Sequence, residues 1–330
     1  MGRHGVSRGV RPRTVVIGMV AIVVIVAAAV GLSFLLKPRH PGAVDLRGPH
    51  GDAPFSLAGV FPAEGDEPLA NPLGIAYDGE YLYVAESDAG MIQVFDLEGG
   101  RVDTIALPVA EGQRSVYPSS VVIAGERLAV VDNAANRVLV IPRRPAGDVE
   151  VDLVLGEAGE APVQPTALTY AEGEFFVADG ADGAIRVYDD AGQHLRSFDV
   201  REQHGLDGPL TALAISEGTL YAADYASGRV VAIDASTGDS DDSEGPAYAL
   251  PRTVEPLGDG VLVVVDGLGR AARLIDQQMN ELASADADTV PEGPMSAPWG
   301  AAWASDDDRL YVTDSGTGRV LVYNLSLDQL

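Results

Sequence analysis

Short apolar segments alternate with turns rich in Gly, Asn and Asp along nearly the whole chain after residue 54. The pattern is clearest in residues 309–324, RLYVTDSGTGRVLVYN, where an apolar segment ends on Asp314 and a second segment begins at Arg319 after a small-residue turn. Five copies of it precede this one, at residues 81–96, 127–142, 174–189, 219–234 and 261–276. Apolar segments of this length between turn residues predict β-strands, and their internal repetition indicates a repeat architecture.

Two landmarks keep the same period of about 45 residues along the chain. One is a proline ahead of the first strand of each unit: Pro72, Pro118, Pro165, Pro209, Pro251 and Pro298. The other is the acid that ends the second strand: Glu86, Asp132, Asp179, Asp224, Asp266 and Asp314. Four short strands in each of six units predict an all-β fold, the six-bladed β-propeller.

The last unit has no clear fourth strand, and the missing segment is found near the start of the chain. Residues 55–72 match the fourth-strand-and-loop segment of residues 150–165. We therefore expect the N-terminal strand of the domain to complete the last blade, which closes the ring and removes an exposed sheet edge.

The repeated residues resemble NHL repeats. The shared pattern is Pro-x-Gly-x-Ala, then Tyr-x-Val-Ala-Asp, a small-residue turn and Arg-Val-x-Val-Tyr-Asp, and the resemblance covers residues 55–330. It implies a six-bladed NHL-like propeller. NHL and related propellers include protein-binding modules, RNA-binding modules, receptor-kinase sensor domains and a few enzymes, so the resemblance implies a fold more firmly than an activity.

The N-terminal region predicts a membrane anchor. Residues 1–13 contain four arginines and no acid, and residues 14–36 form an uncharged stretch of 23 residues. A helix of that length crosses the hydrocarbon core of a bilayer, and the arginines favour a cytoplasmic N-terminus. Residues 37–54, rich in Pro and Gly, are expected to form a tether. The propeller, residues 55–330, would then lie outside the membrane, as the extracytoplasmic part of a single-pass protein.

Charge and composition exclude several functions. The chain has a formal net charge of −27, and all 49 acidic residues follow the apolar stretch. Such a field repels nucleic acid and favours solubility. The chain contains no cysteine, which excludes disulfides, thiolate metal sites and cysteine nucleophiles.

The repeated acids and arginines are interpreted as structural. An Asp at a strand end before Gly, Asn or Ser normally accepts hydrogen bonds from the backbone of its own turn. The third strands of alternate units begin with Arg137, Arg229 and Arg319, which are expected to link neighbouring parts of the ring. A ring of carboxylates holding a divalent metal is the alternative. Glu86 departs from the aspartate pattern, and its longer side chain makes it the acid expected to project into the central mouth.

Irregular positions of the repeat point to a binding surface. The loops that lead into the first strands and those that follow the second strands are expected on one face of the propeller. The predicted binding residues of this mouth are Glu86, Asn71, Tyr117, Asn133, Tyr225, Arg252 and Trp299. Tyr, Trp and Arg are the residue types that dominate binding hot spots.

The sequence as a whole predicts a membrane-anchored binding or scaffold module for a protein, a peptide or a small ligand, with no catalytic constellation and no cofactor. Two alternatives stay open. One is a metal-dependent, lactonase-like hydrolase on the same propeller, and the other is a structural subunit of a membrane complex.

Overall fold

A computed structural model describes residues 54–63, 65–144, 149–156, 159–240, 245–327 and 330. In these residues no helix has both the length and the apolar character needed to cross a membrane. The predicted basic tail, membrane span and most of the tether (residues 1–53) lie outside the described residues.

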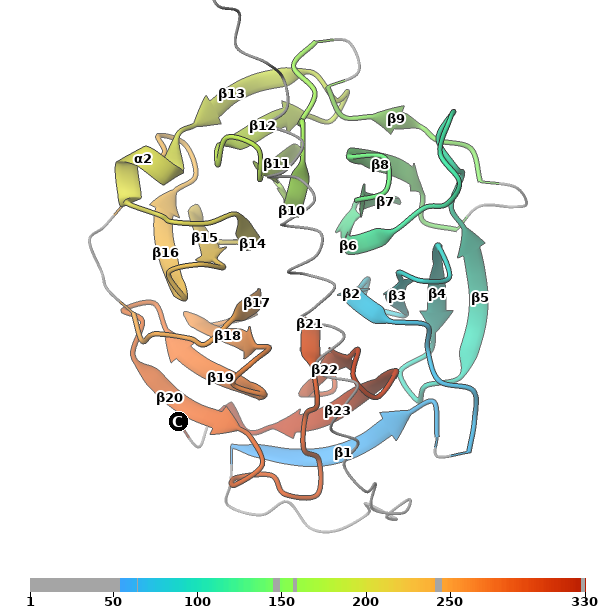
Figure 1. Cartoon of the computed structure of the whole chain (residues 1–330). Coiled ribbons are helices and arrows are strands. Elements are labelled where there is room, and N and C mark those ends of the chain that lie inside the picture. The colour runs from blue at the N-terminus through green and yellow to red at the C-terminus, as the bar shows by residue number, and fades with distance from the viewer. Residues whose placement is uncertain (1–53, 64, 145–148, 157–158, 241–244, 328–329) are drawn as a thin grey trace, which may run out of the picture. The chain divides into compact units, whose positions relative to one another are not determined.

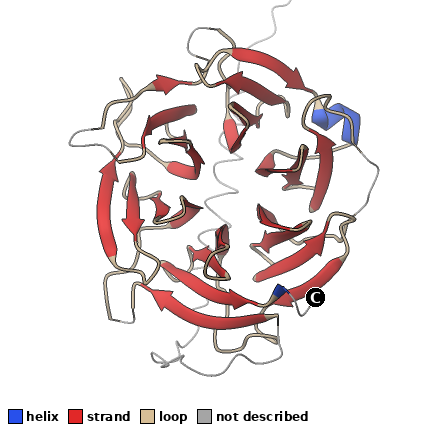
Figure 2. Ribbon diagram, turned by 180° about the vertical axis from the view of Figure 1, so that it is seen from behind, coloured by secondary structure: helices blue, strands red, loops and turns tan. Residues whose placement is uncertain are grey.

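Residues from 55 onward form six antiparallel sheets arranged as the blades of a ring, as predicted (Figures 1 and 2). The innermost strands are β2 (Pro72–Tyr77), β6 (Pro118–Ala124), β10 (Pro165–Ala171), β14 (Leu210–Ser216), β17 (Pro251–Gly258) and β21 (Pro298–Ala304). The second strands are β3 (Leu82–Glu86), β7 (Arg127–Asp132), β11 (Glu174–Asp179), β15 (Thr219–Asp224), β18 (Val261–Asp266) and β22 (Arg309–Asp314). The third strands are β4 (Met91–Phe95), β8 (Arg137–Pro142), β12 (Ile185–Asp189), β16 (Arg229–Asp234), β19 (Ala271–Asp276) and β23 (Arg319–Leu325). The outermost strands are β5 (Arg101–Ala106), β9 (Leu153–Val154), β13 (His194–Phe198), β20 (Glu281–Ala285) and β1 (Phe55–Phe61).

The N-terminal strand closes the ring, which confirms the prediction. β1 pairs antiparallel with β23, so the last blade has the order β1-β23-β22-β21 (Figure 1). Phe55 lies opposite Leu325, and its ring packs edge-on against Tyr323. The first strand of the domain therefore holds the last blade in place.

The expectation of four strands per unit is wrong for the described part of the fourth blade. That sheet has three strands, β14-β15-β16, followed by an isolated bridge between Ile233 and Ser240. A short helix that the strand pattern does not predict, α2 (Val200–His204), precedes this blade. The side chain of Asp199 caps its first turn, and Gly205 ends it in the left-handed conformation with φ 59°.

Tight turns connect the first and second strands. In the third blade Glu172 and Gly173 both have positive φ, 51° and 83°, and Glu217 with Gly218 repeat this in the fourth. Two successive residues of positive φ match the twist of a two-residue hairpin. The acidic residues of these hairpins lie on the face of the ring opposite the acids that end the second strands.

Neighbouring blades pack their apolar faces together. One cluster joins Val263 and Leu274 of the fifth blade to Leu310 and Tyr323 of the sixth, and similar clusters lie between the other blades. Hydrophobic burial between sheets is thus the main force that assembles the ring.

The blades come closest near the axis. A Cβ added at Gly300 would lie 2.5 Å from the carbonyl oxygen of Leu73, and one at Gly74 would lie 2.9 Å from the Cα of Ser120. The hydroxyl of Thr313 also donates to the Leu73 carbonyl, across the junction between the last blade and the first. Only very small residues fit where innermost strands touch.

The outermost strands are irregular at their free edges. β5, β13 and β20 each shift register after their first residue, which leaves Val102, Leu195 and Leu282 as the extra residues of bulges. Bulges of this kind twist an edge away from further strands and hinder sheet-to-sheet association.

Candidate functional site on the proline face

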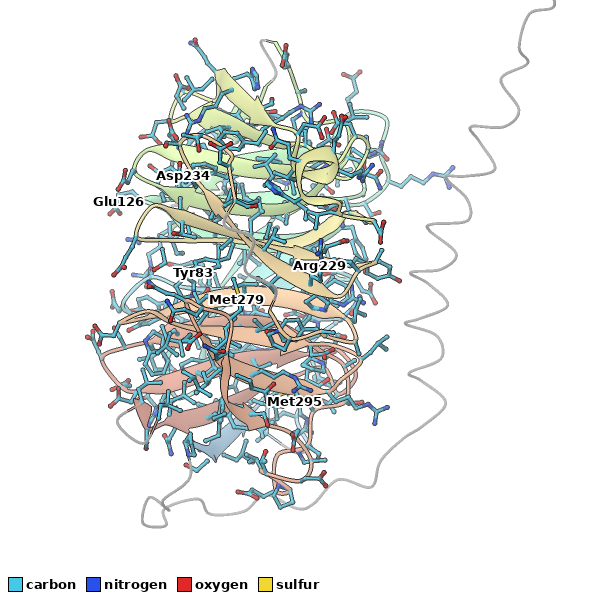
Figure 3. All side chains as sticks on the ribbon, turned by 90° about the vertical axis from the view of Figure 1, so that its left-hand side faces the viewer. Tyr83, Glu126, Arg229, Asp234, Met279 and Met295 are labelled. Atoms are coloured by element: carbon cyan, nitrogen blue, oxygen red, sulfur yellow. The ribbon has the colours of Figure 1, made fainter. Side chains whose placement is uncertain are left out.

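The six acids and the prolines that open the innermost strands lie on one face of the ring, which we call the proline face. The loops that cross from one blade to the next and the turns between second and third strands belong to it. Figure 3 shows the ring from the side, with Glu126 and Asp234 toward one flat face and Arg229 toward the other, the proline face.

Each repeated acid fastens the loop that leads into the innermost strand of its own blade. The carboxylate of Asp179 accepts from the N–H groups of Val163 and Gln164 at 2.7 and 3.0 Å and from that of Ala181, in its own turn, at 2.9 Å. The same arrangement recurs at Asp224, Asp266 and Asp314, and in part at Asp132. These aspartates are at most 1% exposed. The carboxylates therefore accept mainly from backbone N–H groups, and Arg137 and Arg186 add side-chain donors at Asp132 and Asp179. The sequence predicted the backbone donors of the turn but not those of the incoming loop.

Glu86 occupies the same place in the first blade. Its carboxylate accepts from the N–H of Ala70 at 2.8 Å, and the residue is 6% exposed. The expectation that its longer side chain projects into the mouth is not met, because the loop before Pro72 folds over the carboxylate and binds it.

The arginines that open three third strands lie directly opposite the acids, since a four-residue turn separates the two strands. Arg137 donates to Asp132 at 3.0 Å and to the carbonyl of Pro108 in the loop from the first blade. Arg229 donates to the carbonyl of His204 at 2.9 Å. Arg319 pairs with Asp314 in the strand register.

Two of the predicted mouth residues meet at the junction of the first two blades. The Asn71 side-chain amide donates to the hydroxyl of Tyr117 at 2.9 Å and to Asp88 at 3.3 Å. Asn133 is exposed nearby, its backbone N–H bonded to the Tyr117 carbonyl at 3.0 Å. The side chains of Asn71 and Tyr117 are thus bonded to each other, whereas Asn133 joins the group through its backbone.

Three other predicted residues gather at the fourth, fifth and sixth blades. The guanidinium of Arg252 lies over the ring of Trp299, with 3.8 Å between its Cζ and the ring centroid. Burial lowers the pKa of Arg252 to about 10, and the nearby Tyr225 offsets part of this shift. No described carboxylate forms a salt bridge with Arg252. A cation without a counter-ion on a protein of strongly negative charge is a place where an anion can bind.

A second charged residue on the same innermost strand escaped the sequence reasoning. Glu255 accepts only a long hydrogen bond, 3.4 Å, from the backbone N–H of Trp303 on β21. Burial raises its pKa to about 8. By strand register its counterparts in the other blades are Ala76, Val122, Thr169, Ala214 and Ala302, all uncharged.

A register-based comparison of the six innermost strands would have found Glu255. Arg252 and Glu255 are the two charged residues of those strands, and Trp299 and Trp303 are the two tryptophans of the chain. β17 and β21 are neighbours around the centre of the ring (Figure 1). The hydroxyl of Thr253 donates to the Trp299 carbonyl at 2.8 Å and joins the two strands. The site thus consists of an arginine and a carboxyl group on β17, neither in a salt bridge with a described residue, beside two tryptophans on β21.

No three-residue set of His, Asp or Glu with metal-binding geometry occurs in the part of the chain that the structure describes. The acids that could have formed a ring of metal ligands are held apart in separate blades, each by its own loop.

Neither a known protein family nor a curated protein sequence matches this chain. The fold is shared with many solved structures. One is a protein of unknown function from Bacteroides thetaiotaomicron, 13% identical with a TM-score of 0.62, over 79% of this chain and 71% of that one. Another is the virginiamycin B lyase of Staphylococcus aureus, 15% identical with a TM-score of 0.55, over 82% and 100%. A chain of a nidogen/laminin complex is 15% identical with a TM-score of 0.55, over 71% and 85%. At these identities the similarity shows the propeller fold alone.

Proposed function

We propose that the protein is a binding module that holds a partner on the proline face of its propeller, with Arg252 and Trp299 as the anchor. The observation that carries the proposal is the guanidinium of Arg252, stacked on Trp299 and without a carboxylate partner among the described residues. Arg and Trp are among the residue types that contribute most to binding energy in protein interfaces. The nidogen/laminin complex is a case in which a similar propeller occurs with a protein partner.

The setting of the module is a proposal of its own. The arginines of residues 1–13 and the apolar stretch 14–36 support a single-pass protein with its N-terminus in the cytoplasm. The propeller would face the outside and capture its protein, peptide or small-molecule partner there. Protease added to intact cells should then remove the propeller and spare an epitope tag at the N-terminus; protection of the propeller would contradict this orientation.

The hydrolase alternative finds no support in the described residues, because the acids that would bind a metal already accept backbone hydrogen bonds. The structural-subunit alternative would use the rim of the ring. There the bulges of β5, β13 and β20 work against pairing with another strand.

Capture of the partner from the native membrane tests the proposal. The tagged full chain is compared with the double variant Arg252→Ala, Trp299→Ala, which should lose the partner. The chain offers a matched control on the opposite face, where Arg144 lies 3.7 Å from the ring centroid of Tyr81. Arg144→Ala with Tyr81→Ala removes the same chemistry and should leave capture intact. Equal capture by both double variants would move the interface away from the proline face.

A further inference from the structure

Arg252 carries a positive charge, Glu255 carries a carboxyl group whose raised pKa favours the protonated form, and the two side chains do not pair with each other. Among the described residues neither forms a salt bridge, with the other or with any other side chain. Removing a charge from water without a partner is costly, and natural proteins keep such groups rarely. The other five blades build the same strand without any charge, so the propeller fold does not require these two residues.

The two groups lie at different depths along β17. Arg252 is the extra residue of the bulge at the start of β17, next to the proline face, and Glu255 lies three residues further along the strand. At about 3.3 Å per residue their Cα atoms are roughly 10 Å apart. Both side chains approach β21: Arg252 at the ring of Trp299 and Glu255 at the backbone of Trp303.

We propose that these residues form a binding site for a short zwitterionic ligand, with its anionic group on Arg252 and its ammonium group on Glu255. This inference rests on the proposed function, since it takes the proline face as the side from which the ligand arrives. The stacked guanidinium presents its N–H edge to a carboxylate, and the unpaired carboxyl group accepts from an amine. One such molecule supplies the counter-ion that Arg252 lacks, and its ammonium group favours the ionised form of the Glu255 carboxyl group, whose proton passes to water on binding. A free amino acid, an ω-amino acid or the end of a short peptide has this chemistry.

Both tryptophans lie at the site, so tryptophan fluorescence reports binding there. Because Trp299 and Trp303 are the two tryptophans of the chain, tryptophan emission of the intact protein arises at this site. The probes are ω-amino acids of increasing length, from glycine to 8-aminooctanoate, added to the detergent-solubilised full chain. Hexanoate and hexylamine, which carry one charge each, are the matched single-charge probes.

We expect a saturable change in emission whose affinity passes through a maximum with the length of the ω-amino acid. At that length hexanoate and hexylamine should bind at least tenfold more weakly. Arg252→Met and Glu255→Gln should each weaken the zwitterion at least tenfold, while Arg144→Ala with Tyr81→Ala should not. Trp299→Phe and Trp303→Phe then show whether the change in emission comes from Trp299, beside Arg252, or from Trp303, beside Glu255.

Three results would overturn the inference: no emission change with any probe, equal binding of the single-charge probes, or binding unaffected by both charge variants. The proposed function is judged separately by partner capture. If the probes fail while capture still needs Arg252 and Trp299, the ligand class is wrong and the binding face stands. If capture ignores both residues while the zwitterion needs them, the site stands and the partner binds elsewhere.

Discussion

Asp224 faces Arg229 directly across the β15–β16 pair, yet the two side chains do not form a salt bridge. The guanidinium of Arg229 donates to the carbonyl of His204, and the Asp224 carboxylate accepts from four backbone N–H groups at 3.0–3.4 Å. The carboxylate therefore organises two loops, and the arginine holds a third segment.

Replacing Asp224 with Asn should destabilise the protein. The amide keeps one acceptor oxygen and turns its NH2 toward backbone donors, so buried N–H groups lose their partners. Each unsatisfied buried group costs about 1–3 kcal/mol, and we expect a loss of about 2–4 kcal/mol in the free energy of unfolding. Urea unfolding of the full chain measures it. Asp259→Asn, at an exposed hairpin, is the control and should change stability by less than about 0.5 kcal/mol. Equal effects of the two variants would contradict the structural role of the Asp224 carboxylate.

Replacing Arg252 with Met should stabilise the protein. The stem of Met keeps the packing on Trp299, while a partly buried charge without a salt bridge to any described residue disappears, and this burial costs more than the cation–π contact contributes. Thermal unfolding of the full chain should therefore occur at a higher temperature. Arg229→Met, which loses a hydrogen bond to the His204 carbonyl, should lower the unfolding temperature. A lower unfolding temperature for Arg252→Met would mean that Arg252 has a structural role.

Glu255 should make the protein less stable as the pH rises. Its pKa is near 4.5 when unfolded and about 8 when folded, so the folded state binds the extra proton between these values. Stability is then lost as the pH rises from about 4.5 to 8, by a few kcal/mol at most, at about 1.4 kcal/mol per unit of pKa shift. The difference in unfolding free energy between Glu255→Gln and the unchanged chain, measured across this range, isolates the effect. A difference that stays constant with pH would contradict the assigned burial of Glu255.

Gly300→Ala should weaken the junction between the last blade and the first. The new methyl group would meet the Leu73 carbonyl at 2.5 Å, and backbone must move to admit it. Overpacking of this kind costs roughly 1–3 kcal/mol. Gly59→Ala is the matched control, because no atom lies within 4 Å of the added carbon. Chemical denaturation compares the two, and similar midpoints would show that the blades separate easily.

Divalent metals should leave the protein unchanged. Since the repeated acids already accept backbone hydrogen bonds, we expect the unfolding temperature to be the same with Ca²⁺, Mn²⁺, Zn²⁺ or EDTA. A rise of several degrees with one metal, lost in Glu86→Gln, would revive the hydrolase alternative.

The sequence predicted the ring and its closure because the repeat keeps its landmarks. Pro and Asp recur with one period, and residues 55–72 resemble an outer strand. It did not predict α2, whose cap at Asp199 sits in a polar segment without helical periodicity. The predicted position of the Glu86 side chain was also wrong, because a sequence does not show that a loop folds back over the carboxylate.

The sequence also predicted part of the candidate site. Arg252 and Trp299 directly follow the repeated proline, and Tyr225 directly follows the repeated acid, so their departure from the other copies is visible without the structure. Glu255 lies inside a strand whose alignment with the other blades depends on bulges. Strand register was needed to compare it with Ala76 or Ala302, and register became available only with the structure.

The closure by β1 has a consequence for the order of events in folding. Phe55 is among the first residues of the domain to be synthesised, and its partner Leu325 is among the last. Contacts between segments so distant in the chain form slowly. The first strand must wait unpaired while five blades form, and the ring becomes whole only when β23 arrives. Until β23 is made, β1 has no native partner strand, so the pairing of these two strands, rather than the folding of any single blade, completes the ring.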